Sequence, residues 1–438
     1  MDLSNNSHGS ELPASEIWAL GGDTLTASTP RRQMNSVRPL KSFELFAGAG
    51  GLGLGTSRAG FNCRGVLEWN ADACSTLRHN QRNGLDPIRN WEIHQTDARK
   101  FDFKPYAGQV DFVTGGPPCQ PFSMGGKHQA FLDPRDMFPQ AVRSVLEIHP
   151  PSFVFENVRG LVRAKFRNYL AYIMLRFEFP EALPKKDEEW MTHFQRLEKL
   201  KTSGRYSGLR YNVIHRVLNA ADYGIPQKRE RVFIVGFRSD LNVDWSFPQP
   251  THSEEALLRD QFVTSCYWDR HNVGKKLRPP LGTRIAARIE RLSEELFSSF
   301  RPWKTVRDAI GDLPEPCERS ASAIPNHVFQ PGARAYTGHT GSYVDLPAKT
   351  LKAGDHGVPG GENMLLREDG TVRYFSIRES ARLQTFPDRF QFNGSWTESM
   401  RQLGNAVPVD LAHVVAKAVH ERLRARLNHH GSNVQSVR

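Results

Sequence analysis

The stretch Phe43–Gly53, which reads FELFAGAGGLG, decides the fold of this chain. Its apolar beginning predicts a strand over 43–47, and the glycines that follow predict a tight turn opening a helix over 51–60. Glycines at such a turn let a ligand approach the backbone closely. Glu68 lies about twenty residues further on, at the end of the next predicted strand, where a carboxylate suits ribose hydroxyls. A purely structural turn is the alternative, and the glycines alone do not distinguish NAD from an S-adenosyl cofactor.

Short apolar runs alternate with amphipathic segments over the first half of the chain. The predicted strands are 43–47, 64–68, 91–95, 110–114, 152–156, 212–218 and 231–237. The segments between them predict helices at 51–60, 70–82, 136–148 and 160–177. Strands that alternate with helices are typical of the α/β class, so we predict a doubly wound, mostly parallel sheet.

The alternation stops at about residue 239, which marks a change of organisation. The stretch 239–372 is rich in Pro, Gly, Arg and His and predicts a second, irregular domain. Helical patterns return at 377–383 and 409–426. Before this change, the charged stretch 184–208 predicts an exposed helix and loop inserted in the first domain. The polar ends of the chain predict a flexible arm over 1–38 and a flexible tail over 428–438.

Composition narrows the class of protein. The 438 residues carry a net charge of +11, which favours a polyanionic partner. No apolar run approaches the ~18 residues of a membrane span, and the first residues lack the apolar core of a secretory signal. The five cysteines show no paired spacing with one another or with histidines. We therefore expect reduced thiols, a cytoplasmic location and no metal site.

One cysteine has an unusual setting. Cys119 lies in Gly115–Ser123, GGPPCQPFS, just after the apolar run that ends the predicted strand at 110–114. Ligands bind at the carboxyl edge of an open α/β sheet. A thiol held at that edge between prolines therefore indicates a nucleophile with a fixed orientation. A buried structural cysteine is the alternative.

Charged residues follow other predicted strands. Glu156, in Glu-Asn-Val, ends the apolar run at 152–156, and its carboxylate is costly to bury without partners. Arg229 and Arg231 alternate before the strand at 231–237, so both could point the same way and lower the pKa of a nearby thiol. Asp97 follows the third strand, where it could meet an adenine edge or cap a helix. For Glu156 a helix cap, and for the arginines a solvated surface, are the alternatives.

The order of these motifs resembles the DNA cytosine-5 methyltransferase family of bacterial modification enzymes, over roughly residues 41–425. A glycine-rich loop, a strand-end acid, Pro-Cys-Gln-Pro-Phe-Ser, Glu-Asn-Val and Gln-x-Arg-x-Arg occur in the order of that family. Also similar are the Thr350-Leu351 pair, the segment 378–388 and Gly-Asn-Ala-Val-Pro at 404–408. The resemblance implies an S-adenosylmethionine-dependent, Rossmann-like catalytic domain over 39–238, to which 373–427 returns, and a target recognition domain over 239–372.

The resemblance also implies catalytic roles. Cys119 would add to C6 of cytosine, Glu156 would contact N3 and the exocyclic amine, and Arg231 would steady the base with Arg229 nearby. A carboxyl group that protonates or hydrogen-bonds N3 makes C6 a better electrophile, and a covalent step divides a difficult substitution into easier ones.

The implied cofactor is S-adenosyl-L-methionine, with S-adenosyl-L-homocysteine as the product, and this choice disfavours NAD. In the family pattern Glu68 takes the ribose hydroxyls, Trp69 stacks near the adenine and Asp97 meets the adenine amine. The complete implied pocket consists of Phe46, Gly48, Gly50, Gly51, Glu68, Trp69, Asp97, Pro118 and Asn405.

The implied partner is double-stranded DNA, from which the target cytosine must be flipped out. The loop 123–129 would close on the DNA, and 239–372 would read bases in the major groove. A cognate restriction endonuclease acting on the same site is a further possible partner, and a monomer is the expected state. The alternatives are a tRNA cytosine-5 methyltransferase on the same scaffold and a catalytically silent DNA-binding protein.

Overall fold

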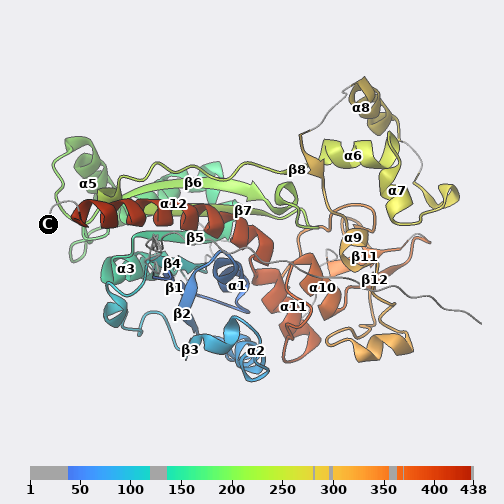
Figure 1. Cartoon of the computed structure of the whole chain (residues 1–438), viewed down its shortest axis with the longest axis horizontal. Coiled ribbons are helices and arrows are strands. Elements are labelled where there is room, and N and C mark those ends of the chain that lie inside the picture. The colour runs from blue at the N-terminus through green and yellow to red at the C-terminus, as the bar shows by residue number, and fades with distance from the viewer. Residues whose placement is uncertain are drawn as a thin grey trace, which may run out of the picture. The chain divides into compact units, whose positions relative to one another are not determined.

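A seven-stranded sheet forms the centre of the computed structural model, which describes residues 38–118, 136–279, 282–294, 299–354, 363–367 and 369–435. The strands follow the order β3-β2-β1-β4-β5-β7-β6 (Figure 1). Their bounds are β1 Lys41–Leu45, β2 Asn62–Glu68, β3 Glu92–Gln95, β4 Phe112–Gly115, β5 Ser152–Val158, β6 Tyr211–Asn219 and β7 Glu230–Arg238. The first five strands pair in parallel, while β7 lies antiparallel between β5 and β6. The predicted α/β class with a mostly parallel sheet is confirmed.

Helices cover both faces of this sheet because its strands are apolar on both sides. Phe153 and Phe155 of β5 belong to one core cluster, and Val154 between them belongs to the other. The first cluster includes residues of α3 (Phe138–Ile148), α4 (Arg167–Glu178) and α5 (Trp190–Ser203). The second includes residues of α1 (Gly51–Arg58) and α12 (Val409–Gln435).

The charged stretch 184–208 differs from its prediction. Its helix, α5, is present, but one face is buried because His193, Phe194 and Leu197 pack into the first core cluster or against Tyr172. The charge of the stretch lies on the other face, where Lys199 is exposed. The predicted exposed helix is therefore an amphipathic helix of the core.

Two glycines of α1 allow close packing of α12. A Cβ atom on Gly51 would lie 2.4 Å from the carbonyl oxygen of Val407, and one on Gly55 would lie 2.4 Å from that of Val409. A larger residue at Gly55 would push α1 and α12 apart, and one at Gly51 would push α1 away from the segment that leads into α12. The glycine-rich stretch after β1 therefore serves helix packing as well as the turn.

The part of 239–372 that the structure describes contains short elements that its composition did not indicate. Two small sheets, β8-β9 and β10-β11-β12, have strands of two or three residues. The elements are β8 His252–Ser253, α6 Glu254–Phe262, α7 Cys266–Arg270, α8 Thr283–Glu294, β9 Arg301–Pro302, α9 Val306–Ile310, β10 Ser342–Tyr343, β11 Met364–Leu366 and β12 Val372–Tyr374. Helices α10 (Ile377–Leu383) and α11 (Trp396–Asn405) follow. Among the described residues, no helix is both long and apolar enough to cross a membrane.

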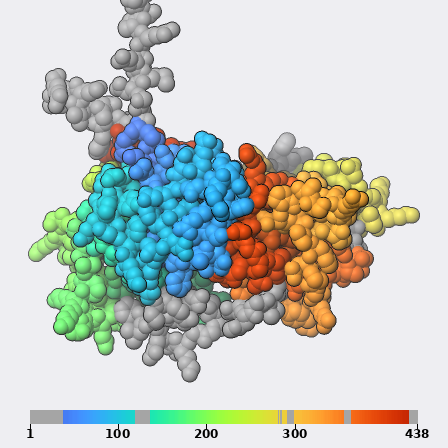
Figure 2. All heavy atoms as spheres, turned by 90° about the horizontal axis from the view of Figure 1, so that it is seen from below, coloured from blue at the N-terminus to red at the C-terminus, as the bar shows by residue number. Residues whose placement is uncertain are grey.

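The segment after α10 packs against α2 (Ala71–Arg82). Asn80 donates to the carbonyl oxygen of Gln391 over 2.7 Å and accepts from its backbone N–H over 2.9 Å. Figure 2 shows this orange-red segment directly beside the blue residues of the first strands and helices. The segment after α10 thus returns to the first half of the chain and covers α2.

Glu44 is a buried acid in the middle of the sheet. It lies in β1 between Val66 of β2 and Thr114 of β4, and only 2% of its surface is exposed. Its Oε2 atom has no hydrogen-bond partner among the described residues. Burial, and then the charge of Glu68, raise the pKa of Glu44 well above its usual value, so this side chain keeps its proton to a higher pH in the folded protein than in the unfolded chain.

We expect Glu44→Gln to become more stable than the wild type as the pH rises. A carboxyl whose pKa is higher in the folded state stabilises the fold below its unfolded pKa of about 4.3 and loses that contribution as the pH rises toward the folded value. Glutamine does not ionise, so the gain is about 1.4 kcal/mol per pH unit over this window. Urea unfolding at pH 5 and pH 8 measures it, with the exposed Glu198→Gln as the control. An equal difference from the wild type at both pH values would contradict the expectation.

Candidate active site

The predicted site residues gather where the parallel strands end. The glycine-rich loop follows β1, Glu68 ends β2, and Gly115 ends β4 beside Phe155 of β5. Because these four strands run in parallel, their carboxyl ends form one edge of the sheet. This edge is the candidate active site.

The glycine-rich loop combines a tight turn with open space. Phe46, Gly48 and Gly50 all have left-handed backbone angles, with φ of 56°, 53° and 82°. A Cβ atom on Gly48 would meet nothing within 4 Å, whereas one on Gly50 would meet Leu77 and Trp91 at 3.0 Å. The space beside Gly48 is therefore available to a ligand, while Gly50 is required by packing.

Glu68 fixes this loop. Its Oε2 atom accepts the backbone N–H of Gly48 over 2.7 Å, and its Oε1 atom accepts those of Trp69 and Asn70 over 2.9 and 2.7 Å. A carboxylate has about four acceptor positions, so one remains for a ribose hydroxyl. The indole of Trp69 is 70% exposed and presents an open face. Asn70 caps α2 by accepting from the N–H of Ala73, which holds the end of β2 in place.

Asp97 binds Arg99 rather than capping a helix. Its carboxylate accepts from the Arg99 guanidinium at 2.6–3.1 Å and from the backbone N–H of Arg99 at 2.9 Å. These hydrogen bonds lower the pKa of Asp97. An adenine amine would have to share this carboxylate with Arg99.

The loop after β4 is tied to β5 by Asn157. Its buried Nδ2 donates to the carbonyl oxygen of Pro117 over 2.9 Å. Pro118 is exposed, and Cys119 and the predicted lid at 123–129 lie outside the described residues. The sequence alone identifies Asn157 only as part of a motif, because its partner lies 40 residues away.

Glu156 and Arg231 form an ion pair at this edge. The Nε of Arg231 lies 2.9 Å from Oε1 of Glu156, and both side chains are largely buried. A Cβ atom on Gly116 would lie 3.3 Å from Oε2 of Glu156, so the second carboxylate oxygen faces the loop that leads to Cys119. Burial raises the pKa of Glu156, although the charges of Arg231 and Arg229 oppose this shift.

Arg229 has a different environment from Arg231. Its fully buried guanidinium donates to the carbonyl oxygens of Leu351, Gly404 and Ala406 at 2.7–3.0 Å. Burial, followed by the charge of Arg231, lowers the pKa of Arg229. The two arginines therefore bind different partners, because Arg229 precedes the first residue of β7.

The same network extends to Gln227. Its side chain donates to the carbonyl oxygen of Leu383 over 3.2 Å and accepts from the N–H of Leu351 over 3.1 Å. A Cβ atom on Gly404 would lie 2.1 Å from the backbone nitrogen of Ala353, so these chain segments are in direct contact. Asn405, which ends α11, is exposed next to this contact.

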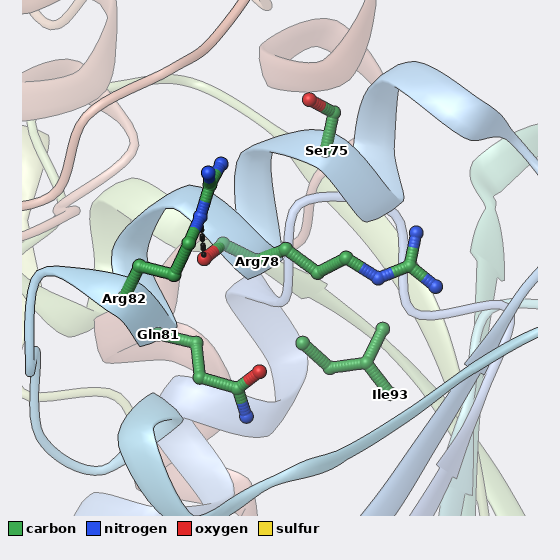
Figure 3. A pocket seen from close by; sticks show the side chains of 5 residues that line it. All are labelled: Ser75, Arg78, Gln81, Arg82 and Ile93. Atoms are coloured by element: carbon green, nitrogen blue, oxygen red, sulfur yellow. Dashed lines mark hydrogen bonds between the residues drawn. The ribbon is translucent and has the colours of Figure 1, made fainter.

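A separate hollow of about 540 Å³ opens on α2 beside β3, and its lining includes Arg78 and Arg82 (Figure 3). Figure 3 shows these two side chains pointing in different directions, so their guanidinium groups do not converge on one ligand. The hollow contains none of the predicted site residues. It is not part of the candidate active site.

Comparisons with known proteins agree with this fold. Residues 40–180 and 183–421 match the family of C-5 cytosine-specific DNA methylases. The Type II methyltransferase M.Eco47II of Escherichia coli is 31% identical over 383 residues, 86% of this chain and 78% of that protein. The Type II methyltransferase M.FnuDI of Fusobacterium nucleatum is 30% identical over 387 residues, 88% of this chain and 95% of that protein.

Solved structures share the fold. A DNA modification methyltransferase encoded within an E. coli prophage has a TM-score of 0.50 at 21% identity, and it matches 88% of this chain and 99% of its own. The S. pombe Dnmt2 methyltransferase has a TM-score of 0.50 at 18% identity, with the same coverage.

Fold and site together define an α/β enzyme with a glycine-rich loop and a buried acid–arginine pair at one sheet edge. The chain belongs to the C-5 cytosine-specific DNA methylase family. It is therefore a methyltransferase that acts on C5 of cytosine in DNA, and the resemblance predicted from the ordered motifs is confirmed.

Proposed function

We propose that this chain methylates one cytosine within a specific double-stranded DNA site, through a covalent bond between Cys119 and C6 of the base. The observation that carries the proposal is the buried Glu156–Arg231 pair facing the loop that leads to Cys119. It provides a proton-holding group and a fixed cation next to the expected nucleophile.

The open space beside Gly48 suits S-adenosylmethionine, which supplies the methyl group when bound. Open space at Gly48 admits a ligand, the remaining acceptor position of Glu68 suits a ribose hydroxyl, and the exposed Trp69 offers a stacking face. Phe46, Gly50 and Gly51 shape the turn, while Pro118, Asp97 and Asn405 complete the proposed pocket.

Glu156 activates the base in this proposal. Because burial raises its pKa, the carboxyl retains a proton at higher pH than an exposed glutamate and can give it to N3 of cytosine. The Cys119 thiolate forms a bond to C6, and C5 takes the methyl group, which leaves S-adenosyl-L-homocysteine behind. A base, for which a water molecule suffices, then takes the proton from C5. The bond between Sγ and C6 breaks as N3 returns its proton to Glu156, so the enzyme is regenerated.

The buried cysteines support Cys119 as the nucleophile. Burial raises the pKa of the Cys63 thiol, and burial together with Glu68 raises that of Cys74 to about 11. Neither forms an appreciable thiolate near neutral pH, and a thiolate is the reactive form.

Arg231 holds Glu156 in position and faces the base, whereas Arg229 acts as a positioning residue. The three carbonyl groups that Arg229 binds belong to 351 and 404–406, which include the proposed pocket residue Asn405. Arg229 thereby links the acid–arginine pair to the cofactor side of the site.

A basic segment follows β5 and suits the phosphates of DNA. Arg163, Lys165 and Arg167 are exposed, and no acidic residue of the described chain pairs with them. They follow the Glu-Asn-Val motif, so a duplex that delivers its cytosine to Glu156 passes close to them.

Replacing Arg163, Lys165 and Arg167 together by alanine is expected to lower the affinity for DNA. It should also make that affinity less sensitive to the salt concentration. Each phosphate that the variant no longer neutralises reduces the slope of log K against log salt concentration by about 0.9. Binding titrations from about 50 to 200 mM salt measure the slope, because affinity that depends on phosphate contacts falls steeply over this range. The exposed Lys199→Ala on α5 is the control, and an unchanged slope in the triple variant would refute the contact.

The names of the relatives favour a role in a restriction-modification system. M.Eco47II and M.FnuDI are Type II methyltransferases, and we propose the same role here. This role implies a cognate endonuclease that cuts the same site when it is unmethylated, and a cytoplasmic location with the DNA. One chain contains every proposed catalytic group, which favours a monomer.

Methyl transfer to DNA and to tRNA tests the substrate. Purified protein is incubated with methyl-labelled S-adenosylmethionine and either unmethylated plasmid or tRNA, and bisulfite sequencing maps any product in the plasmid. We expect label in DNA at one recurring short sequence and none in tRNA. Label in tRNA alone would contradict the proposal.

A further inference from the structure

The segment Val328–Thr340, here called the reading segment, lies in a stretch without acidic residues. No Asp or Glu occurs from Arg319 to Val344, although the chain has 47 acidic residues. Such a stretch meets a polyanion without like-charge repulsion. This observation alone does not distinguish a DNA contact from a neutral loop.

The reading segment exposes large apolar and aromatic side chains. Val328 is 71% exposed, Phe329 41% and Tyr336 53%. Arg334 is exposed and has no hydrogen-bond or ion-pair partner among the described residues. Exposed apolar groups and an unpaired arginine within one short segment are typical of a recognition site.

Both ends of the reading segment are firmly held. The buried His327 contacts Ser376 Oγ and the carbonyl oxygen of Pro314 at 2.8 and 2.7 Å. At the other end, Lys349 donates to Thr340 Oγ1 over 3.0 Å. The residues between these two ends therefore extend from anchored positions at both sides.

A turn shapes the tip of the segment. Tyr336 and His339 exchange backbone hydrogen bonds of 3.2 and 2.8 Å, and their ring centroids lie 4.4 Å apart. Arg334 lies two residues before this turn. A side chain next to a short, closed turn is well placed to enter a groove.

The residues just after the reading segment are also bonded to the stretch that contains Arg229. The backbone N–H of Ala348 donates to the carbonyl oxygen of Pro226 over 2.9 Å, and its carbonyl oxygen accepts from the N–H of Lys228 over 2.8 Å. Thr350 Oγ1 donates to the carbonyl oxygen of Lys228 over 2.7 Å. Arg229 then binds Leu351. The support of the reading segment and the Gln-x-Arg-x-Arg stretch are thus one hydrogen-bonded unit.

We propose that the reading segment enters the major groove of the recognised site and that Arg334 reads a guanine there. The guanidinium matches the O6 and N7 acceptors of guanine, and Val328, Phe329 and Tyr336 exclude water from the neighbouring bases. This inference rests on the proposed function, since it names the residues that choose the DNA site.

Arg334→Ala tests the inference once the wild-type protein has revealed its site. We expect kcat/KM on that site to fall about 5- to 150-fold, with Arg334→Lys in between, because alanine cannot make the bidentate interaction with guanine. Replacing the read guanine by 7-deazaguanine removes N7 and should slow the wild type but not Arg334→Ala. The control is Arg216→Ala, an exposed arginine on β6 that lacks an acidic partner in the described chain.

The outcomes distinguish a failure of the inference about Arg334 from a failure of the proposed function. Arg334→Ala with wild-type activity and site choice would overturn the inference, as would equal sensitivity of both proteins to 7-deazaguanine at every position. Equal binding of S-adenosylmethionine by the variant and the wild type shows that the variant is folded. A wild-type protein that methylates no DNA would instead overturn the proposed function.

Discussion

Cys119→Ser is expected to lose methyl transfer to DNA almost completely, with turnover lowered about 10⁴-fold or more. A serine hydroxyl ionises far less readily than a thiol, so no comparable nucleophile is present to attack C6. Transfer of labelled methyl groups to plasmid DNA measures the loss. Binding of DNA and of S-adenosylmethionine should remain close to that of the wild type.

Two other cysteines provide matched controls. Cys266 and Cys317 are exposed free thiols, so Cys266→Ser and Cys317→Ser make the same chemical change away from the proposed site. Both should retain activity. DNA containing 5-fluorocytosine adds a direct readout, because C5 cannot release fluorine as it releases a proton and the covalent complex persists. A denaturation-resistant complex formed by Cys119→Ser would disprove its role as the nucleophile.

Arg229→Ala is expected to destabilise the protein by about 5 kcal/mol and to impair both substrate and cofactor binding. Its removal leaves three buried carbonyl groups without their donor, and each such group costs roughly 1–3 kcal/mol. Urea unfolding measures the stability. Arg229→Lys should be intermediate, since an ammonium group cannot reproduce the planar arrangement of the guanidinium donors.

The exposed Arg159 provides the comparison for Arg229. It pairs with Glu230, the residue next to Arg229, and Arg159→Ala should change the free energy of unfolding by less than about 1 kcal/mol. If Arg229→Ala were as stable as the wild type but inactive, Arg229 would act directly on the substrate rather than through Leu351, Gly404 and Ala406.

The sheet could be predicted because its signals are local. Phe153 to Phe155 form an uninterrupted apolar run, which a strand buried on both faces requires. The reversed direction of β7 leaves no such signal, because an apolar strand has the same composition in either direction. The burial of one face of α5 differs from the prediction for a related reason. The charges of the stretch indicate a solvated face, and the buried face is formed by a few residues, His193, Phe194 and Leu197.

The candidate site was predictable only in part. Glycines and the acid after β1 and β2 indicate a ligand loop, but the three N–H groups that bind Glu68 follow from the folded turn. The carbonyl partners of Arg229 lie more than 120 residues away in sequence, so no local pattern predicts them. The motif spacing predicts that Arg229 and Arg231 act together, yet only Arg231 pairs with Glu156.

Release of tritium from C5 tests the central claim most directly. DNA that carries [5-³H]cytosine at the recognised site is incubated with the wild-type protein and S-adenosylmethionine, and tritium in water is compared with methyl groups in DNA. We predict equal molar amounts of both, and neither with Cys119→Ser. Methyl transfer to the DNA without release of tritium would place the methyl group elsewhere on the base and contradict the account.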